Sequence, residues 1–580
     1  MAERLLHQLR TSRILVIAAC AAVIVHAFLM LGSLPHGLYN DEASIGYNAW
    51  AIAHAARDEH GFTMPLFFEA FGEWKNPVYI YTLALLLKVL PLTIAVDRIP
   101  AAIYGCVTIF CCAAAAYRYT GSRLGGLLVL AIGAATPWLT LLSRDAFEVI
   151  SMVGFLAVAV AATLWHPKPT LLTSAITSAA LGVCTYAYST GRLMALLFFV
   201  VWGVSTFWSD LKRPWRILVN PVAWTGTLPA FGAYVILFFW MIHNPGALVS
   251  RFGNVSIAAG GASLPKIVGR FLTNLFTYLS PGYLFVTGDQ NLRQSTQYGG
   301  MLLLGTLPLL VTGILVTARS FRTSIRARFL LIGLAAAPVA AALTEEGTPH
   351  ALRSSDMLPF LLCLIGAGTV ALGRWLLVHN RSWAYVLAAF LLVEGAYWQV
   401  DATAGYSLRS QAAFNTTELE AISKAISVSH GAPIYVPDAL ASTTSFASTT
   451  SGTVQPISVS EGLPAQMYIF AAFSHPVLPP PRPTPDSTSY FAKIYHLVIV
   501  PISLLDSAPP GSIIVLPAPA APPPHAVLLA KYSITAPWNA TVDAPVATSP
   551  SYAVYRTAEP TVSYSPSAAG TGTPVVYRHS

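Results

Sequence analysis

The chain has little charge for its length, and this shortage sets its class. Only 10% of its 580 residues are charged, whereas soluble domains carry about 25%. Hydrophobic residues make up 55%, and runs of about 20 apolar residues recur over roughly the first 400 positions. Such runs are long enough to cross a bilayer as helices, so we expect a polytopic α-helical membrane protein. We do not interpret the net charge of +8 as nucleic-acid binding, because Lys and Arg collect in the cytoplasmic loops of membrane proteins.

Cysteine is also scarce, and no spacing of Cys and His indicates zinc. The six cysteines all lie in apolar runs, and none follows residue 400: Cys20, Cys106, Cys111, Cys112, Cys184 and Cys363. This pattern argues against a disulfide framework and favours buried thiols that pack as small hydrophobes. The chain also lacks a glycine-rich phosphate loop, which argues against direct nucleotide binding.

Eleven segments are predicted to span the membrane. They are 14–34, 99–117, 123–143, 147–165, 170–189, 192–208, 219–242, 299–318, 329–344, 357–373 and 383–400. The first is interpreted as a retained helix, because no small-residue cleavage site follows it. A twelfth apolar run, 77–96, contains Lys88 and Pro91. If it lies in the interface without crossing, the basic loops such as "ARSFRTSIRAR" all face the side of the N-terminus, as the positive-inside rule requires.

This topology places the N-terminus in the cytoplasm. It predicts a multi-pass protein of the inner (plasma) membrane. The predicted outer segments are the loops 35–98, 143–148, 243–298 and 344–356, together with the tail. We divide the chain into a transmembrane catalytic domain, 1–401, and an extracytoplasmic domain, 402–580. The tail is rich in Ser, Thr and Pro, and its strand-like runs "APIYVP", "YHLVIVP", "SIIVLP" and "YAVYR" with a helix near "ELEAISKAIS" predict a small α/β domain.

Acids and cations recur in several of the predicted outer loops, close to the membrane surface. The candidate residues there are Asp41, Glu42, Glu73, Lys75, Arg144, Glu148, Arg192, Arg251, Asp289, Arg293, His350 and Arg353. Each alone has a simpler interpretation: an outer Arg is more often an anchor at the headgroups than a ligand. By the same reasoning Glu42 flanks or orients Asp41, Asp145 is an exposed loop acid, and "RDEHG" at 57–61 is a solvated turn.

A sugar carried on a lipid phosphate would require this combination of charges. The phosphate is the leaving group at headgroup level, and its growing negative charge calls for Lys or Arg, for which Lys75 and Arg251 are suited. The attacking hydroxyl needs a carboxylate to take its proton, for which Asp41 is suited. Nearby acids stabilise the positive charge that develops on the sugar ring in the transition state. Fixed cations can neutralise the phosphate, so no metal is required by this chemistry.

Six stretches occur in an order typical of one family. They are "YNDEASIGYNAW", "GEWKNPVYIY", "VDRIPAAIYG", "LLSRDAFE", "SPGYLFVTGDQNLRQST" and "TPHALRS". With these marks the chain resembles, over roughly residues 10–400, the GT-C superfamily of integral-membrane glycosyltransferases, family 39. That group includes protein O-mannosyltransferases and the lipid A aminoarabinose transferase. The resemblance implies a polyprenyl-phosphate sugar donor, an inverting displacement that is metal-independent or weakly metal-assisted, and an acceptor glycolipid, polysaccharide or protein.

The resemblance also implies roles for individual residues. The first-loop acid, the catalytic base or its close support, falls on Asp41, and a second acid falls on Glu148. The family's Glu-Lys-Pro mark is interrupted here as Glu73-Trp74-Lys75-Asn76-Pro77. Its lysine, which contacts the lipid phosphate, falls on Lys75. Arg251 and Arg353 match phosphate or sugar contacts loosely. The expected partners are the lipid-linked donor, the acceptor and membrane lipids, without nucleic acid, and no cofactor is indicated.

Two other functions are weighed against sugar transfer. A transporter or lipid flippase usually carries ionisable residues at mid-membrane and inverted repeats, whereas the predicted spans here are nearly free of charge and no repeat is evident. A non-catalytic scaffold with an outer binding domain would leave the converging charged loops unexplained.

Overall fold

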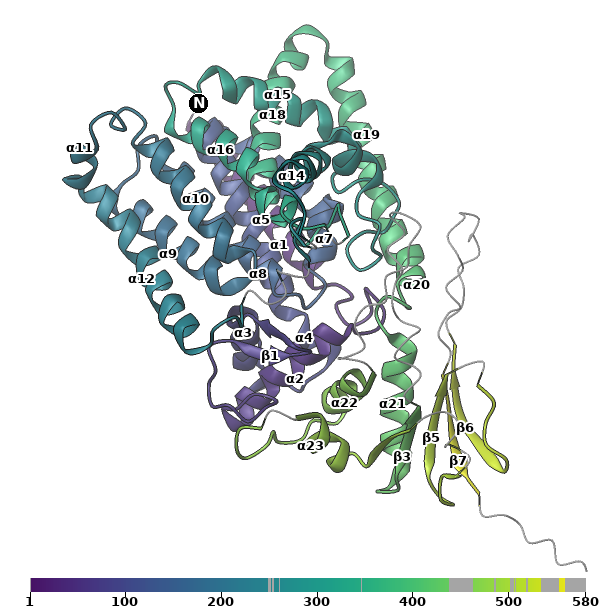
Figure 1. Ribbon diagram of the computed structural model, residues 1–580. Coiled ribbons are helices and arrows are strands. Elements are labelled where there is room, and N and C mark those ends of the chain that lie inside the picture. Colours follow the sequence, from purple (N-terminus) through teal and green to yellow (C-terminus); the bar gives the residue numbers. More distant parts are fainter. Residues whose placement is uncertain are drawn as a thin grey trace, which may run out of the picture.

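The computed structural model of the protein describes residues 2–248, 252, 255–259, 261–345, 347–437, 463–484, 487–500, 505, 507–517, 520–533 and 552–558. Most of these form a helical bundle with a helical and β-structured layer at one end (Figure 1). The predicted candidate Arg251 lies outside the described residues.

The bundle is built from apolar helices joined by short connections. Its α-helices are α1 (Ala2–Phe28), α5 (Ile99–Thr120), α6 (Arg123–Ala135), α7 (Pro137–Leu142), α8 (Val149–Trp165), α9 (Leu171–Ala187), α10 (Gly191–Thr206), α11 (Pro214–Leu218), α12 (Pro221–His243), α14 (Leu264–Leu279), α15 (Leu307–Arg319), α16 (Ile325–Ala336), α17 (Val339–Ala342), α18 (Leu358–His379) and α19 (Arg381–Val400). Tighter or wider turns form η1 (Gly282–Thr287), η2 (Leu304–Thr306), η3 (Ser355–Met357) and η4 (Asp401–Tyr406).

An apolar helix lies at the position of each of the eleven predicted spans. Within the described residues, five helical stretches are long and apolar enough to cross a membrane: Ile94–Thr120, Pro221–His243, Ile325–Ala342, Ser355–His379 and Arg381–Arg409. The other apolar helices are shorter, so the count of eleven crossings stays a prediction. The segment 77–96 forms the 11-residue helix α3 (Pro77–Leu87) and a separate short turn, and its interfacial placement likewise stays a prediction.

Caps and glycines set the helix ends at the basic loops. The chain leaves α5 at Gly121, whose φ of 67° lies in the left-handed region that glycine adopts without strain. The side chain of Ser122 then accepts a hydrogen bond from the Gly125 backbone and starts α6. Asn220 caps the Val222 backbone in the same way at the start of α12, where Pro221 occupies the first helical position.

The layer at one end of the bundle begins with the segment between α1 and α5. It contains α2 (Asn40–Ala55), the antiparallel hairpin β1 (Phe68–Ala70) and β2 (Glu73–Lys75), then α3 and α4 (Ile94–Asp97). Figure 1 shows α2 at the opposite end of the bundle from the N-terminus. We call the end that carries α2 the site end.

The C-terminal part adds a five-stranded mixed sheet with helices. Its elements are α20 (Ser407–Arg409), α21 (Thr416–Ser429), β3 (Ile434–Pro437), α22 (Leu463–Ser474), α23 (Ser487–Ile494), β4 (Leu497–Val500), β5 (Ile513–Pro517), β6 (Ala526–Tyr532) and β7 (Tyr552–Thr557). The strand order is β4-β3-β5-β7-β6, parallel from β4 to β5 and antiparallel from β5 to β6. The four predicted strands and the helix near 418–427 are confirmed, and the sequence analysis missed β6.

The C-terminal part packs directly on α2. One hydrophobic core joins Ala43 and Tyr47 of α2 to residues of α21, α22 and the sheet, including Phe470 and Ile513. Gly46 faces α22 so closely that an added Cβ would lie 2.6 Å from the Phe473 ring. The helix that carries Asp41 therefore has the bundle on one side and the C-terminal part on the other. The domain boundary at 401/402 stays a prediction.

Candidate functional site

Asp41 and Lys75 form an ion pair at the site end. Asp41 is in the first turn of α2, and Lys75 is the last residue of β2. Lys75 Nζ donates to Asp41 Oδ1 at 2.7 Å. The Lys75 side chain is 10% exposed and that of Asp41 is 39% exposed. A ligand can therefore reach the carboxylate from outside, while the ammonium is enclosed behind it.

Two carboxylates keep Lys75 charged. Burial alone would lower the pKa of Lys75, but Asp41 and Glu148 outweigh it and raise the pKa above its ordinary value. The centre of the Phe71 ring lies 5.7 Å from Nζ, which is within the range of a cation–π contact. A charged lysine at the end of a short hairpin is suited to bind an anion such as a phosphate.

Glu148 is fixed beside this pair by Asn76. Glu148 immediately precedes α8, and it accepts hydrogen bonds from the Asn76 backbone N at 2.5 Å and from Asn76 Nδ2 at 2.8 Å. Arg192 Nη2 donates to Asn76 Oδ1 at 2.8 Å. Burial raises the pKa of Glu148 to about 7, although Lys75 and Asn76 act to lower it. Because Asn76 follows Lys75, this chain of contacts ties the end of β2 to the starts of α8 and α10.

Glu42, the neighbour of Asp41, is a structural residue. Its side chain and that of Arg98 are both fully buried, and Arg98 Nε and Nη2 donate to the two Glu42 oxygens at 2.9 and 3.0 Å. The backbone N of Ala146 donates to Oε1 at 2.8 Å, and that of Tyr39 to Oε2 at 3.0 Å. A buried carboxylate with this many donors holds the start of α2 against the loop before α8.

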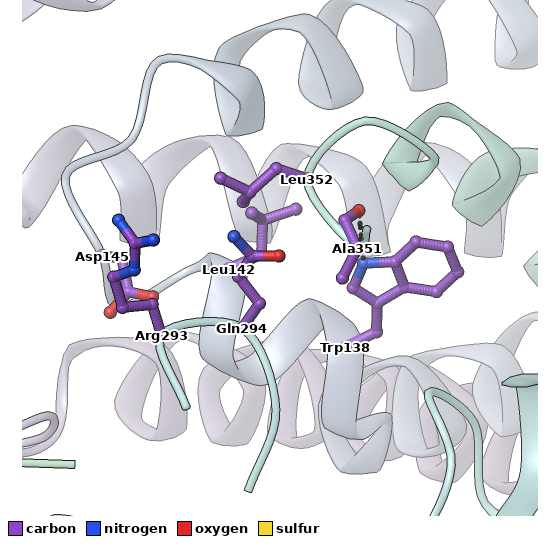
Figure 2. Close-up of a pocket in the computed structure, with 7 residues that line it drawn as sticks. All are labelled: Trp138, Leu142, Asp145, Arg293, Gln294, Ala351 and Leu352. Carbon is purple, nitrogen blue, oxygen red and sulfur yellow. Dashed lines mark hydrogen bonds between the residues drawn. The ribbon is translucent and has the colours of Figure 1, made fainter. Parts of the chain in front are cut away.

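A narrow pocket beside Asp145 is lined by Trp138, Leu142, Asp145, Arg293, Gln294, Ala351 and Leu352. Figure 2 shows Asp145 next to Arg293, with Gln294 between them and Trp138. Asp145 is buried, and burial holds its pKa well above the ordinary range although Arg98 and other cations lower it. The Arg293 guanidinium lies 4.2 Å from the centre of the Tyr39 ring, at the start of α2. The expectation that Asp145 is an exposed acid was wrong, because the loop folds between α7 and α8.

The other candidates mainly join loops to one another. Asp289 Oδ2 accepts from the Ala351 backbone at 2.6 Å, which links two predicted outer loops, and burial raises the pKa of Asp289 to about 6. Arg353 is buried close to Asp289. The His350 backbone N donates to the Tyr278 hydroxyl at 3.1 Å. Arg144 donates to the backbone carbonyl of His26 in α1 at 2.7 Å, so it fixes a helix.

The predicted residues thus fall into two neighbouring groups. The first surrounds Lys75 and contains Asp41, Glu73, Glu148 and Arg192, with Glu73 acting on Lys75 through its charge. The second surrounds the Asp145 pocket and contains Glu42, Asp289, Arg293, His350 and Arg353. The exposed carboxylate and the buried cation that could meet a lipid phosphate both belong to the first group. The specific roles predicted for these residues stay predictions.

Sequence reasoning missed Asn76 and Arg98. Asn76 bridges Glu148 and Arg192, and its only signal was its position inside the interrupted Glu-Lys-Pro mark. Arg98 is fully buried and pairs with Glu42, and its signal was a charged residue at the very start of an apolar run.

The expectation of a solvated turn at 57–61 was also wrong. Asp58, Glu59 and His60 are all buried there. The Tyr468 hydroxyl donates to Glu59 Oε2 at 3.4 Å, and the His60 ring is 3.3 Å from the Ser487 hydroxyl. Burial raises the pKa of Glu59 to about 8. The C-terminal part buries this charged turn through residues more than 400 positions later in the chain, such as Tyr468 and Ser487. The local sequence therefore does not predict the burial.

The fold is similar to that of solved structures of ArnT and of an oligosaccharyltransferase. ArnT from Cupriavidus metallidurans bound to undecaprenyl phosphate aligns with a TM-score of 0.50 at 13% sequence identity, over 93% of this chain and 97% of that chain. ArnT from Cupriavidus metallidurans in the apo state gives a TM-score of 0.47 at 15% identity, over 93% and 97%. An oligosaccharyltransferase from Archaeoglobus fulgidus in complex with Zn and sulfate gives 0.44 at 12% identity, over 84% and 68%.

No protein-family model and no curated protein matches the sequence. The first of these structural alignments confirms the GT-C resemblance at the level of the fold. Among the residues that the structure describes, no group of three or more His, Cys, Asp or Glu side chains could hold a metal ion.

Proposed function

We propose that the chain transfers a sugar from a polyprenyl-phosphate donor to an acceptor hydroxyl on the extracytoplasmic side of the membrane. The observation that carries the proposal is the ion pair of an enclosed Lys75 with a partly exposed Asp41. The structural likeness to ArnT, which was solved with undecaprenyl phosphate bound, makes that lipid the first donor carrier to test. The acceptor is a glycolipid, a polysaccharide or a protein.

In the proposed mechanism Lys75 binds the donor phosphate. A phosphate oxygen replaces Asp41 Oδ1 as the partner of the ammonium. The donor is a phosphodiester with one negative charge, and the leaving polyprenyl phosphate gains a second, so Lys75 binds the leaving group more strongly than the donor. The pKa of Lys75 is raised, so the cation is already charged when the phosphate arrives. Arg353 and Arg251 are assigned to the phosphate or the sugar from the family resemblance.

Asp41, once released from Lys75, acts as the general base. The acceptor oxygen attacks the anomeric carbon, and its proton passes to the Asp41 carboxylate. The bond from the anomeric carbon to the phosphate oxygen breaks, and the electron pair leaves with the polyprenyl phosphate beside Lys75. Attack opposite to the leaving phosphate inverts the anomeric centre. Glu148 holds Asn76 and thereby keeps Lys75 in place, in addition to the catalytic role that the resemblance gives it.

The test is a transfer reaction with the purified full chain. We would add lipid-linked sugars extracted from the source membranes and follow the release of undecaprenyl phosphate by mass spectrometry. The proposal predicts release by the native chain and loss of release in Asp41→Asn and in Lys75→Ala. Lys88→Ala, which removes an exposed lysine at the end of α3, is the matched control and should retain release. Unchanged release in both site variants would refute the assignment.

A further inference from the structure

Helix α14 has an unusual distribution of polar and apolar residues. It lies in the predicted outer loop 243–298, and its 16 residues include two cations, Lys266 and Arg270, and no acid. At about 100° per residue, side chains four apart lie on one face of a helix. Seen this way, α14 divides lengthwise into three faces, each in a different environment.

The face that contacts the protein carries the polar side chains Arg270, Asn274 and Tyr278, with the half-buried Ile267 and Phe271 beside them. Asn274 Nδ2 donates to the carbonyls of Ala342 at 3.2 Å and Thr344 at 3.1 Å. One turn earlier, Arg270 Nη1 donates to Glu345 Oε2 at 2.7 Å and to the Ile257 carbonyl at 3.1 Å. One turn later, the buried Tyr278 hydroxyl accepts from the His350 backbone. These contacts dock α14 on α17 and on the loop that carries Arg353.

The apolar face points away from the protein. Leu264, Val268, Leu272 and Phe276 are 71%, 48%, 44% and 68% exposed. A helix on a soluble protein has the reverse arrangement, with its apolar stripe inward and its polar face outward. Between this apolar face and the docked face lies a third, exposed strip that is polar or open. It contains Lys266, Gly269 and Thr273, and a Cβ added at Gly269 would meet nothing within 4 Å.

We propose that α14 lies along the membrane interface at the site end, with Leu264, Val268, Leu272 and Phe276 among lipid acyl chains. The strip of Lys266, Gly269 and Thr273 then faces headgroups and water, as in other interfacial amphipathic helices. The absence of acids and the presence of Lys266 match anionic phospholipid headgroups. This inference concerns membrane contact and does not depend on the proposed reaction.

Placing α14 at the interface also fixes how deep the candidate site lies relative to the membrane surface. Its last turn holds His350 through Tyr278, and the next residue, Ala351, is bonded to Asp289 and to Trp138 beside the Asp145 pocket. A helix fixed at headgroup level therefore fixes these loops at the same level. A phosphate in the lipid headgroup region would meet them without leaving the bilayer surface.

The test measures what surrounds each face of α14. Single cysteines at Val268, Leu272 and Phe276, and at Lys266 and Thr273 as controls on the same helix, are spin-labelled in a full chain whose six native cysteines are replaced. The labelled proteins are placed in nanodiscs of phosphatidylcholine and phosphatidylglycerol. The ratio of accessibility to oxygen, which partitions into lipid, over accessibility to a water-soluble nickel chelate is measured by electron paramagnetic resonance. Each variant must melt at the temperature of the parent.

The proposal predicts a ratio several-fold higher at Val268→Cys, Leu272→Cys and Phe276→Cys than at Lys266→Cys and Thr273→Cys. Equal access of the nickel chelate to all five positions would place the apolar face in water and overturn the proposal. Low access of both reagents to the apolar positions would show that protein covers them, either a second copy or another segment of this chain, and would overturn it equally.

Discussion

Glu148 accepts two hydrogen bonds from Asn76, one from its backbone N and one from Nδ2, while Arg192 donates to the side-chain oxygen Oδ1 of Asn76. Lys75 directly precedes Asn76, so the position of the proposed phosphate-binding ammonium depends on a residue that has no charge of its own. This arrangement brings together an acid, a cation and an amide from three separate segments of the chain.

Asn76→Ala should weaken lipid-phosphate binding without touching a charged group. The substitution removes the Nδ2 donor to Glu148 and the acceptor for Arg192, and leaves their buried polar groups unpaired, which costs about 1–3 kcal/mol of stability. We expect a lower melting temperature and a weaker affinity for undecaprenyl phosphate, measured by native mass spectrometry. Asn220→Ala, which removes a helix cap at the start of α12, is the matched control. It should lower stability and leave the affinity unchanged; an equal loss of affinity in both variants would mean that Asn76 acts only through stability.

Glu148→Gln should change how stability depends on pH. Burial raises the pKa of Glu148 from 4.5 to about 7, so the folded state binds a proton more tightly than the unfolded chain. Its contribution to stability is full below 4.5 and is lost as the pH rises through about 7. Gln cannot ionise, so it lacks this pH dependence, although it offers the Asn76 donors one acceptor oxygen in place of two. We therefore expect the variant to gain stability relative to the native chain over this range, on the order of 3 kcal/mol.

The measurement for this prediction is the difference in melting temperature between the two proteins from about pH 4.5 to about pH 8. Glu420→Gln, the same change on the exposed face of α21, gives the baseline difference. If the difference for Glu148→Gln does not vary with pH more than that baseline, the burial of a protonated Glu148 is contradicted.

The two adjacent acids of α2 should lose different amounts of stability on amide substitution. Glu42→Gln leaves the fully buried Arg98 without its charge partner, which costs about 3–5 kcal/mol. Asp41→Asn retains an oxygen for Lys75 and leaves Glu148 as a second carboxylate near the ammonium, so it should lower stability less than Glu42→Gln does. Thermal unfolding distinguishes the two. A larger loss of stability in Asp41→Asn than in Glu42→Gln would reverse the assignment of structural and functional acid.

Gly46→Ala should loosen the C-terminal part from α2. The new Cβ would lie 2.6 Å from the Phe473 ring and 2.8 Å from Asp97 Oδ1, so α22 must shift, at about 1–3 kcal/mol. Hydrogen exchange of the backbone amides of α22 and the second half of α2 should increase. Gly232→Ala in α12, where a Cβ meets nothing within 4 Å, should leave these amides unchanged. Unchanged exchange in Gly46→Ala would indicate that this interface tolerates the added methyl group.

Local patterns in the sequence predicted much of this fold, because apolar runs and strand-like alternation depend on near neighbours. The positions of the bundle helices and of β3, β4, β5 and β7 followed from such patterns. Asp41 and Lys75 were chosen as charged residues of the first predicted outer loop, and the ion pair between them was not predicted. The burial of Glu59 and Asp145 did not, because it depends on which distant segment covers them: Tyr468 from α22 in one case, Arg293 in the other. The structural role of Glu42 was equally hidden, since its partner Arg98 lies 56 residues away.

The most direct test of the central claim is native mass spectrometry of the purified full chain with undecaprenyl phosphate. The account predicts a bound lipid that Lys75→Ala loses and that Lys88→Ala retains, because only Lys75 is the enclosed cation beside Asp41. Binding of equal strength in all three proteins, or in none of them while each remains folded, would contradict a lipid-phosphate site at Lys75.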